Sequence, residues 1–184
     1  MKTRILITIG DINGIGPEIV LKTLKRSQIT KKYDLTVVSP FSVLSHYARL
    51  LNIKLTADDF NILPIGSEKV RIETGRITAA SGFISGLAVQ TAVELCMAGD
   101  YDAIVTAPIS KKALNLGGYR FDGHTEMLGA LGKSKETCML MLSDKLNMGF
   151  ATTHPPLKIV AGLITKDLLR RKLSVCYNSL RKDL

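Results

Sequence analysis

The chain has 184 residues, of which 46% are hydrophobic, and a formal net charge of +9. These values suit one globular domain with a core, or one domain and part of a second. No apolar run approaches the roughly 18 residues of a membrane span, and the apolar stretch after Lys2 and Arg4 is too short for a signal peptide. We therefore expect a cytoplasmic protein that has no membrane partner.

The positive charge makes nucleic acid a candidate partner, but its distribution argues against one. Six basic and two acidic residues lie between positions 166 and 184, so nearly half of the excess charge sits in one terminal segment. The chain has no tryptophan, and no aromatic platform for stacking bases is apparent. We expect a basic pocket for an anionic small molecule, and no nucleic acid.

The cysteines Cys96, Cys138 and Cys176 are odd in number and widely spaced. They lack the close pairing of a zinc ribbon or a redox motif. This spacing favours reduced, mostly buried thiols.

The first part of the chain alternates β-rich runs with helical patterns. Strands are expected over 4–10, 34–39 and 60–65, and helices over 16–27, 42–52 and 79–97. In the first helix, Ile19, Val20 and Leu24 form the expected apolar face. In the long helix, Gly82 and Gly86 lie four residues apart on one face, which would allow close packing against another element.

The second part continues this alternation and then changes. The pattern predicts a strand over 101–110 that Pro108 stops, short helices within 110–118 and 123–132, a hairpin of strands over 137–142 and 146–153, and a last helix from about Thr165. Alternating strands and helices indicate a layered α/β fold with a mainly parallel sheet, to which the hairpin adds an antiparallel piece.

The stretch "GDINGIGPE" (10–18) follows a strand and opens a helix, as a dinucleotide-binding fingerprint does. Gly14 and Gly16 begin a G-x-G pattern, but position 19 is isoleucine, so the fingerprint fails. No Lys-Ser or Lys-Thr pair follows, which excludes a P-loop. A tight strand-to-helix turn remains, although its backbone amides could bind an anion.

Two polar stretches follow the strand that ends near Pro108. "TAPISKKALN" (106–115) places Lys111 just past the carboxyl end of a strand, where ligands settle in open α/β sheets. Lys111 could hold a phosphate or carboxylate or move protons, or it could lie on a solvated helix start. In "DGHTE" (122–126), Asp122 or Thr125 could cap the next helix, and His124 could instead bind a ligand.

His154 in "FATTHPPL" (150–157) lies between β-like residues and two prolines. Stiff backbone on both sides suits a metal ligand, but a lone histidine is more often structural. No further ligands lie near it in the sequence. The remaining histidine, His46, falls in a helical pattern and is interpreted as a surface or packing residue.

Four motifs together resemble the N-terminal part of the 4-hydroxythreonine-4-phosphate dehydrogenase family of vitamin B6 biosynthesis. They are "TIGDINGIGPE", "AIVTAPISKKALN", "FDGHTEML" and "ATTHPPL". The resemblance covers the whole chain, which spans about the first half, or somewhat more, of a typical member. It implies a fold similar to isocitrate and isopropylmalate dehydrogenases, and a homodimer with active sites in a cleft at the subunit interface.

The resemblance also implies roles for single residues. Residues 1–184 would form the first α/β domain and part of the second, as a truncated N-terminal portion. His124 and Thr125 would contact the phosphorylated substrate, and Lys111 would be catalytic. His154 would be one of three histidine ligands to a divalent metal such as zinc, magnesium or cobalt. The other two histidines and most cofactor contacts would lie in a later portion, so no residue is assigned to the cofactor.

The implied reaction is the oxidation of 4-phosphooxy-L-threonine by NAD or NADP. Decarboxylation then gives 3-amino-2-oxopropyl phosphate, a step of pyridoxal phosphate biosynthesis. A metal on the alcohol oxygen would lower the pKa of that group. The same motifs would serve a dehydrogenase of a four-carbon aldonate 4-phosphate or of a cis-diol. An inactive remnant that binds a phosphorylated ligand is the alternative from a different class, and this 184-residue chain is expected to be inactive or badly impaired.

Overall fold

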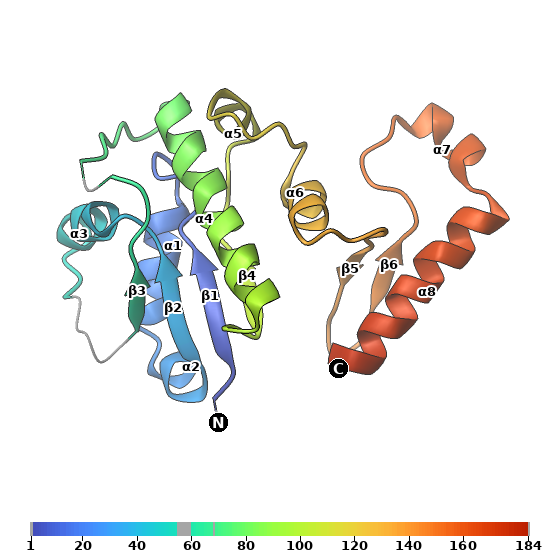
Figure 1. Cartoon of the computed structure of the whole chain (residues 1–184), viewed down its shortest axis with the longest axis horizontal. Helices are drawn as coiled ribbons and strands as arrows, with labels where there is room; N and C mark the ends of the chain where they lie inside the picture. Colours follow the sequence, from blue (N-terminus) through green and yellow to red (C-terminus); the bar gives the residue numbers. More distant parts are fainter. Residues whose placement is uncertain (1, 55–59, 68, 184) are drawn as a thin grey trace. The chain divides into compact units, whose positions relative to one another are not determined.

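The computed structural model describes residues 2–54, 60–67 and 69–183. The chain divides into two compact units, Met1–Gly132 and Lys133–Leu184, which we call unit 1 and unit 2. Unit 1 holds the sheet and six helices among its described residues, and unit 2 holds a hairpin and two helices (Figure 1).

The centre of unit 1 is a parallel sheet with the strand order β3-β2-β1-β4. Its strands are β1 (Arg4–Thr8), β2 (Asp34–Val38), β3 (Asn61–Leu63) and β4 (Ala103–Thr106). In the register, Ile7 lies opposite Val37 on one side and Val105 on the other. The four predicted strands and the mainly parallel sheet are confirmed. Central strands of such a sheet are covered on both faces, which explains their near-continuous apolar runs.

Helices flank the sheet on both faces. Those of the first part are α1 (Gly16–Leu24), α2 (Ser27–Lys32), α3 (Phe41–Leu50) and α4 (Ala79–Ala98). In Figure 1, α4 crosses the front of the sheet and α1 lies behind it. The helix expected over 16–27 ends earlier, at Leu24, and a separate short helix, α2, begins at Ser27. The expected apolar face of α1 was wrong in one residue, because Ile19 is exposed while Leu21 is buried beside Val20 and Leu24.

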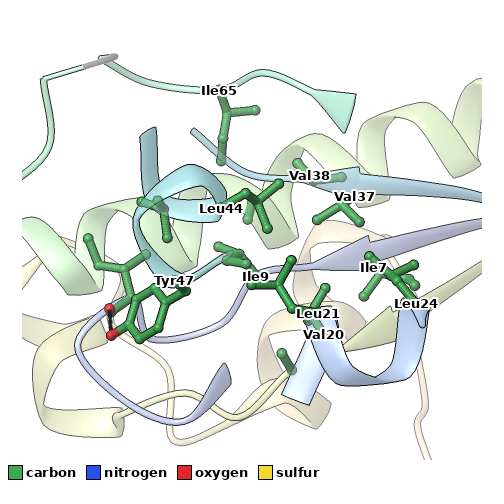
Figure 2. Close-up of a cluster of buried hydrophobic side chains, with 14 of the residues drawn as sticks. Ile7, Ile9, Val20, Leu21, Leu24, Val37, Val38, Leu44, Tyr47 and Ile65 are labelled. Carbon is green, nitrogen blue, oxygen red and sulfur yellow. Dashed lines mark hydrogen bonds between the residues drawn. The ribbon is translucent and has the colours of Figure 1, made fainter. Parts of the chain in front are cut away.

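The main core lies between the sheet and these helices (Figure 2). Ile9 and Val37 are fully buried on the sheet side, and Leu21 and Leu44 meet them from α1 and α3. Burying each such side chain contributes about 1.5–3 kcal/mol. The Tyr47 ring is buried with them, and its hydroxyl donates to the Ile12 carbonyl at 2.8 Å. This bond fixes the loop that follows β1.

The long helix α4 is where close packing occurs. It begins after Thr78, whose side chain accepts from the Ser81 N–H, and it ends at Gly99 in the left-handed conformation. It is long and apolar enough to span a membrane, which corrects the expectation that no apolar run approaches that length. Half of the apolar window is buried inside unit 1. A Cβ at Gly82 would lie 1.7 Å from the Ala113 carbonyl oxygen, so the predicted close packing of this glycine is confirmed.

Two short helices, α5 (Lys111–Leu116) and α6 (His124–Leu131), complete unit 1. A second apolar cluster holds them against α4, and its buried members are Val89, Val93, Leu114 and Met127. Because α5 and α6 each contribute one fully buried side chain to it, the polar residues at their starts have fixed positions.

Unit 2 contains the hairpin of β5 (Met139–Met141) and β6 (Met148–Phe150), followed by α7 (Leu157–Leu163) and α8 (Lys166–Asp183). The strands pair antiparallel, as predicted. The helix α7 directly after the two prolines was not predicted. None of the described side chains of unit 2 is buried, so this unit lacks a closed core of its own.

Candidate functional site

The loops that leave β1 and β4 meet at the carboxyl edge of the sheet, because these parallel strands are neighbours. The Asp11 N–H donates to the Pro108 carbonyl at 2.9 Å. Gly10 has a φ of +72°, and a Cβ there would lie 2.4 Å from the same oxygen. Only glycine permits this approach, so it joins the "GDINGIGPE" loop directly to the "TAPIS" loop.

Asn13 explains the rest of the glycine-rich loop. Its side chain is 1% exposed, donates to the Arg76 carbonyl and the Thr78 hydroxyl, and accepts from the Glu73 N–H. A Cβ at Gly16 would lie 2.5 Å from the Ile9 carbonyl oxygen. These glycines therefore bring backbone against backbone where the loop enters α1.

Lys111 begins α5 at this same edge. The Ser110 side chain caps the helix by accepting from the Ala113 N–H at 3.2 Å. The Asn115 side chain donates to the Lys111 carbonyl at 2.9 Å and to the Phe121 carbonyl at 3.4 Å. These bonds fix the backbone of Lys111 relative to the segment that leads into α6, and the lysine side chain is exposed.

The start of α6 differs from the expected capped helix. Its N-cap is Gly123, and no side chain caps it, so the prediction that Asp122 or Thr125 does so was wrong. A Cβ at Gly123 would lie 3.3 Å from a Glu126 carboxylate oxygen and 4.0 Å from Lys111 Nζ. Glycine thus leaves room for groups of both charges beside an uncapped helix start, whose N–H groups favour an anion.

His124 is the first residue of α6 and is half-buried. Its Nε2 is buried and has no hydrogen-bond partner among the described residues. Burial lowers the pKa of His124 below its ordinary value, because the charged form is poorly solvated there. A neutral imidazole with an unpaired buried nitrogen is costly unless a ligand pairs with it. Thr125, also half-buried, follows directly.

We call Lys111, Gly123, His124, Thr125 and Glu126 the Lys111–His124 cluster. The structure brings together the residues predicted in two separate motifs, which lie about a dozen positions apart. Sequence reasoning missed Gly123 as a member of the cluster. Its position between Asp122 and His124, ahead of an apolar helical run, was the available signal.

His154 lies in unit 2. It is exposed, lies between β6 and α7, and has a φ of +62°, a conformation that non-glycine residues rarely adopt. Among the described residues, no group of three His, Cys, Asp or Glu side chains could hold a metal ion. His154 alone does not fit a three-ligand site, and its metal role stays a prediction. His46 lies in α3 with its ring edge-to-face on Tyr47.

Comparison with known proteins shows the family of the chain. A family model described as "Pyridoxal phosphate biosynthetic protein PdxA" matches residues 15–184. The chain belongs to the PdxA family. Three of the four motifs of the predicted resemblance lie within this match, and the first, "TIGDINGIGPE" (8–18), overlaps its start. The predicted family is confirmed.

PdxA relatives match along nearly the whole chain. A 4-hydroxythreonine-4-phosphate dehydrogenase of Nostoc sp. is 36% identical and covers 99% of this chain. A Fusobacterium nucleatum relative with the provisional name D-threonate 4-phosphate dehydrogenase is 30% identical over 99% of it. A crystal structure of a 4-hydroxythreonine-4-phosphate dehydrogenase from Burkholderia phymatum is 26% identical, with a TM-score of 0.87 over 99% of this chain.

The chain spans only part of these relatives. It covers 54% of the Nostoc protein, 59% of the Fusobacterium protein and 59% of the Burkholderia chain. The fold prediction of an α/β architecture with a mainly parallel sheet and a hairpin is confirmed by the close structural match.

Proposed function

We propose that this PdxA chain forms part of a dehydrogenase that oxidises 4-phosphooxy-L-threonine with NAD or NADP and then decarboxylates the product to 3-amino-2-oxopropyl phosphate. The names of the PdxA relatives support the reaction class. The observation that carries the proposal is the buried, unpaired Nε2 of His124 at the start of α6, where Lys111 Nζ lies 4.0 Å from the Cβ position of the adjacent Gly123. That arrangement is suited to an anionic group of a small molecule.

In this proposal the phosphoryl group binds at the start of α6. The neutral His124 ring carries its proton on Nε2 and donates it to a phosphate oxygen. This hydrogen bond gives the buried nitrogen the partner that it otherwise lacks. Thr125 contributes its hydroxyl and the uncapped helix start contributes N–H donors. Lys111 supplies a formal charge that attracts the dianion, and a charged hydrogen bond of this kind contributes about 1.5–3 kcal/mol.

Lys111 is also the proposed catalytic residue. Oxidation removes a hydride and a proton from the secondary alcohol, and decarboxylation places negative charge on the same oxygen. An ammonium group held near that oxygen stabilises the charge as it develops. The side chains of Ser110 and Asn115 fix the backbone from which this lysine side chain extends.

His154 is proposed as one ligand of a divalent metal. Such a metal, when bound, would polarise the substrate oxygen. The described residues supply this single candidate, so no step of the mechanism is derived through the metal. The family suggests a nicotinamide cofactor, and no described loop is assigned to it. We further propose that unit 1 is the first domain, that unit 2 is part of the second, and that the enzyme is a cytoplasmic homodimer.

A second candidate function is supported by relatives with the provisional name D-threonate 4-phosphate dehydrogenase. This substrate is a four-carbon aldonate 4-phosphate. It carries the same phosphoryl group and a hydroxyl where 4-phosphooxy-L-threonine has an amino group. The Lys111–His124 cluster would serve both substrates.

Turnover by the product of the complete gene tests the proposal. Reduced nicotinamide and released CO2 are measured with 4-phosphooxy-L-threonine, with D-threonate 4-phosphate, and with unphosphorylated 4-hydroxythreonine as the control. We expect a higher kcat/KM for 4-phosphooxy-L-threonine and little turnover of the control. A preference for D-threonate 4-phosphate would select the second candidate. Binding of both phosphorylated compounds without any turnover would indicate a non-catalytic ligand-binding protein.

A further inference from the structure

The strongest unassigned feature outside the Lys111–His124 cluster is a pair of thiols in unit 2. Cys138 immediately precedes β5 and Cys176 lies in α8, 38 positions later. Their Sγ atoms are 3.1 Å apart. Both cysteines are free and half-buried rather than mostly buried, and Cys96 lies in α4 of unit 1.

Neighbouring contacts hold the two thiols in place. Lys172, one helical turn before Cys176, donates to the Thr137 carbonyl and to the Glu136 carboxylate, which lies 3.1 Å away. Arg171 pairs with the same carboxylate at 2.7 Å. These contacts hold α8 against the segment that enters β5. Cys138 is the next residue of that segment, and Cys176 lies one helical turn further along α8.

The space around the pair is also specific. A Cβ at Gly149 of β6 would lie 3.0 Å from Cys176 Sγ and 3.9 Å from Cys138 Sγ, so a glycine keeps the position beside the thiols open. Both cysteines line an apolar cavity of about 210 Å³ between the hairpin and α8. A molecule the size of hydrogen peroxide fits in this volume.

We propose that Cys138 and Cys176 form a reversible redox site, in which a peroxide converts the two thiols into an intramolecular disulfide. One thiolate attacks a peroxide oxygen, the O–O bond breaks, and a sulfenic acid and hydroxide form. The second thiol then attacks the sulfenic sulfur, an S–S bond forms, and water leaves. In total, two thiols are oxidised, one hydrogen peroxide is reduced, and two water molecules are released. Closing the bond to about 2.0 Å requires the sulfur atoms to approach by roughly 1 Å.

Reactivity of the pair is expected to be moderate. Burial and the Cys138 thiol raise the pKa of Cys176, while the nearby Lys172 ammonium lowers it. A raised pKa reduces the thiolate fraction at neutral pH, so oxidation is slow until peroxide is abundant. The disulfide would tie α8 to the hairpin in a unit that has no buried side chain among its described residues.

Peptide mapping of the 184-residue chain tests this proposal. After treatment with hydrogen peroxide we expect one free thiol instead of three, a mass lower by about 2 Da, and a Cys138–Cys176 peptide that dithiothreitol separates. Cys96 serves as the internal control and stays free. Three thiols still free after oxidation, a disulfide that includes Cys96, disulfides formed only between chains, or a mass gain that dithiothreitol does not reverse would each contradict the proposal.

Limited trypsin digestion supplies a second readout. Cleavage within α8, which is rich in lysine and arginine, should slow several-fold after oxidation of the wild-type chain and return to its original rate after reduction. A Cys176→Ser variant should show no such change, and a Cys96→Ser variant should behave as the wild type does. Equal cleavage rates before and after formation of the mapped disulfide would show that the bond does not fasten α8 to the hairpin.

Discussion

The Gly82→Ala substitution tests how the fold positions the candidate site. The added Cβ would lie 1.7 Å from the Ala113 carbonyl oxygen and 2.7 Å from the Leu114 nitrogen. An ordinary contact needs at least 3.4 Å, so α4 and α5 must separate by roughly 1.7 Å. No change of rotamer relieves a clash with backbone atoms, and α5 begins with Lys111 only two residues earlier.

Two effects of opposite sign set the size of this change. Overpacking costs about 1–3 kcal/mol, and the backbone clash places Gly82 at the upper end. Alanine is better than glycine within a helix by about 1 kcal/mol. We expect the free energy of unfolding of unit 1 to fall by about 2 kcal/mol, or Tm to fall by roughly 6–10 °C.

Urea and thermal denaturation followed by far-UV circular dichroism measure this loss. Gly162→Ala is the matched control, because this helical glycine of α7 has nothing within 4 Å of an added Cβ. Gly86→Ala should cost less than Gly82→Ala, since its neighbour is the Tyr119 ring, which can shift. A Gly82→Ala chain as stable as the wild type would refute the claim that α4 and α5 pack through their backbones.

Further predictions concern Asn13, His124 and unit 2. Asn13→Ala should lower the free energy of unfolding by about 1–3 kcal/mol, because it leaves the Arg76 carbonyl, the Glu73 N–H and the Thr78 hydroxyl without the partner that the buried amide supplies; Asn61→Ala, which removes one exposed hydrogen bond to Asp34, should cost below about 0.5 kcal/mol. By NMR, His124 should titrate below 6.5, its ordinary pKa. Because the folded pKa is the lower one, the unfolded chain takes up the proton first, so stability should fall as the pH drops below about 6.5; a His124→Asn chain with the same pH dependence of unfolding would contradict this. Limited proteolysis should remove unit 2 before it cuts unit 1, since only unit 1 has buried side chains among the described residues; mass spectrometry that shows the reverse order would contradict the assignment of the core.

The sheet was predictable from the sequence because its strands are short apolar runs that end at glycine or proline. The run before Gly10 and the run before Pro108 became β1 and β4, which are neighbours in the sheet. The Gly82–Gly86 spacing also carried usable information, because two glycines on one helical face mark a place where another backbone can approach. In each case the signal is local in the sequence.

Features that depend on contacts between distant residues were not predictable. Asn13 looks like an ordinary turn residue, and its partners near Arg76 are more than sixty positions away. Cys138 and Cys176 are widely separated, so their spacing suggested unrelated thiols. At the start of α6, Asp122 and Thr125 are both residue types that commonly cap helices, yet the N-cap is Gly123 and no side chain caps the helix. The structure leaves that position open beside Lys111.

Binding of 4-phosphooxy-L-threonine to variants of the complete gene product tests the central claim most directly. Isothermal titration should show that Lys111→Met weakens binding by about 10- to 100-fold, through loss of a charged hydrogen bond to the phosphoryl group. His124→Asn should also weaken it, while Lys112→Met, at the neighbouring exposed lysine of α5, should bind nearly as the wild type does. Equal affinities for the wild type, Lys111→Met and His124→Asn would contradict the assignment of the Lys111–His124 cluster to the phosphorylated substrate.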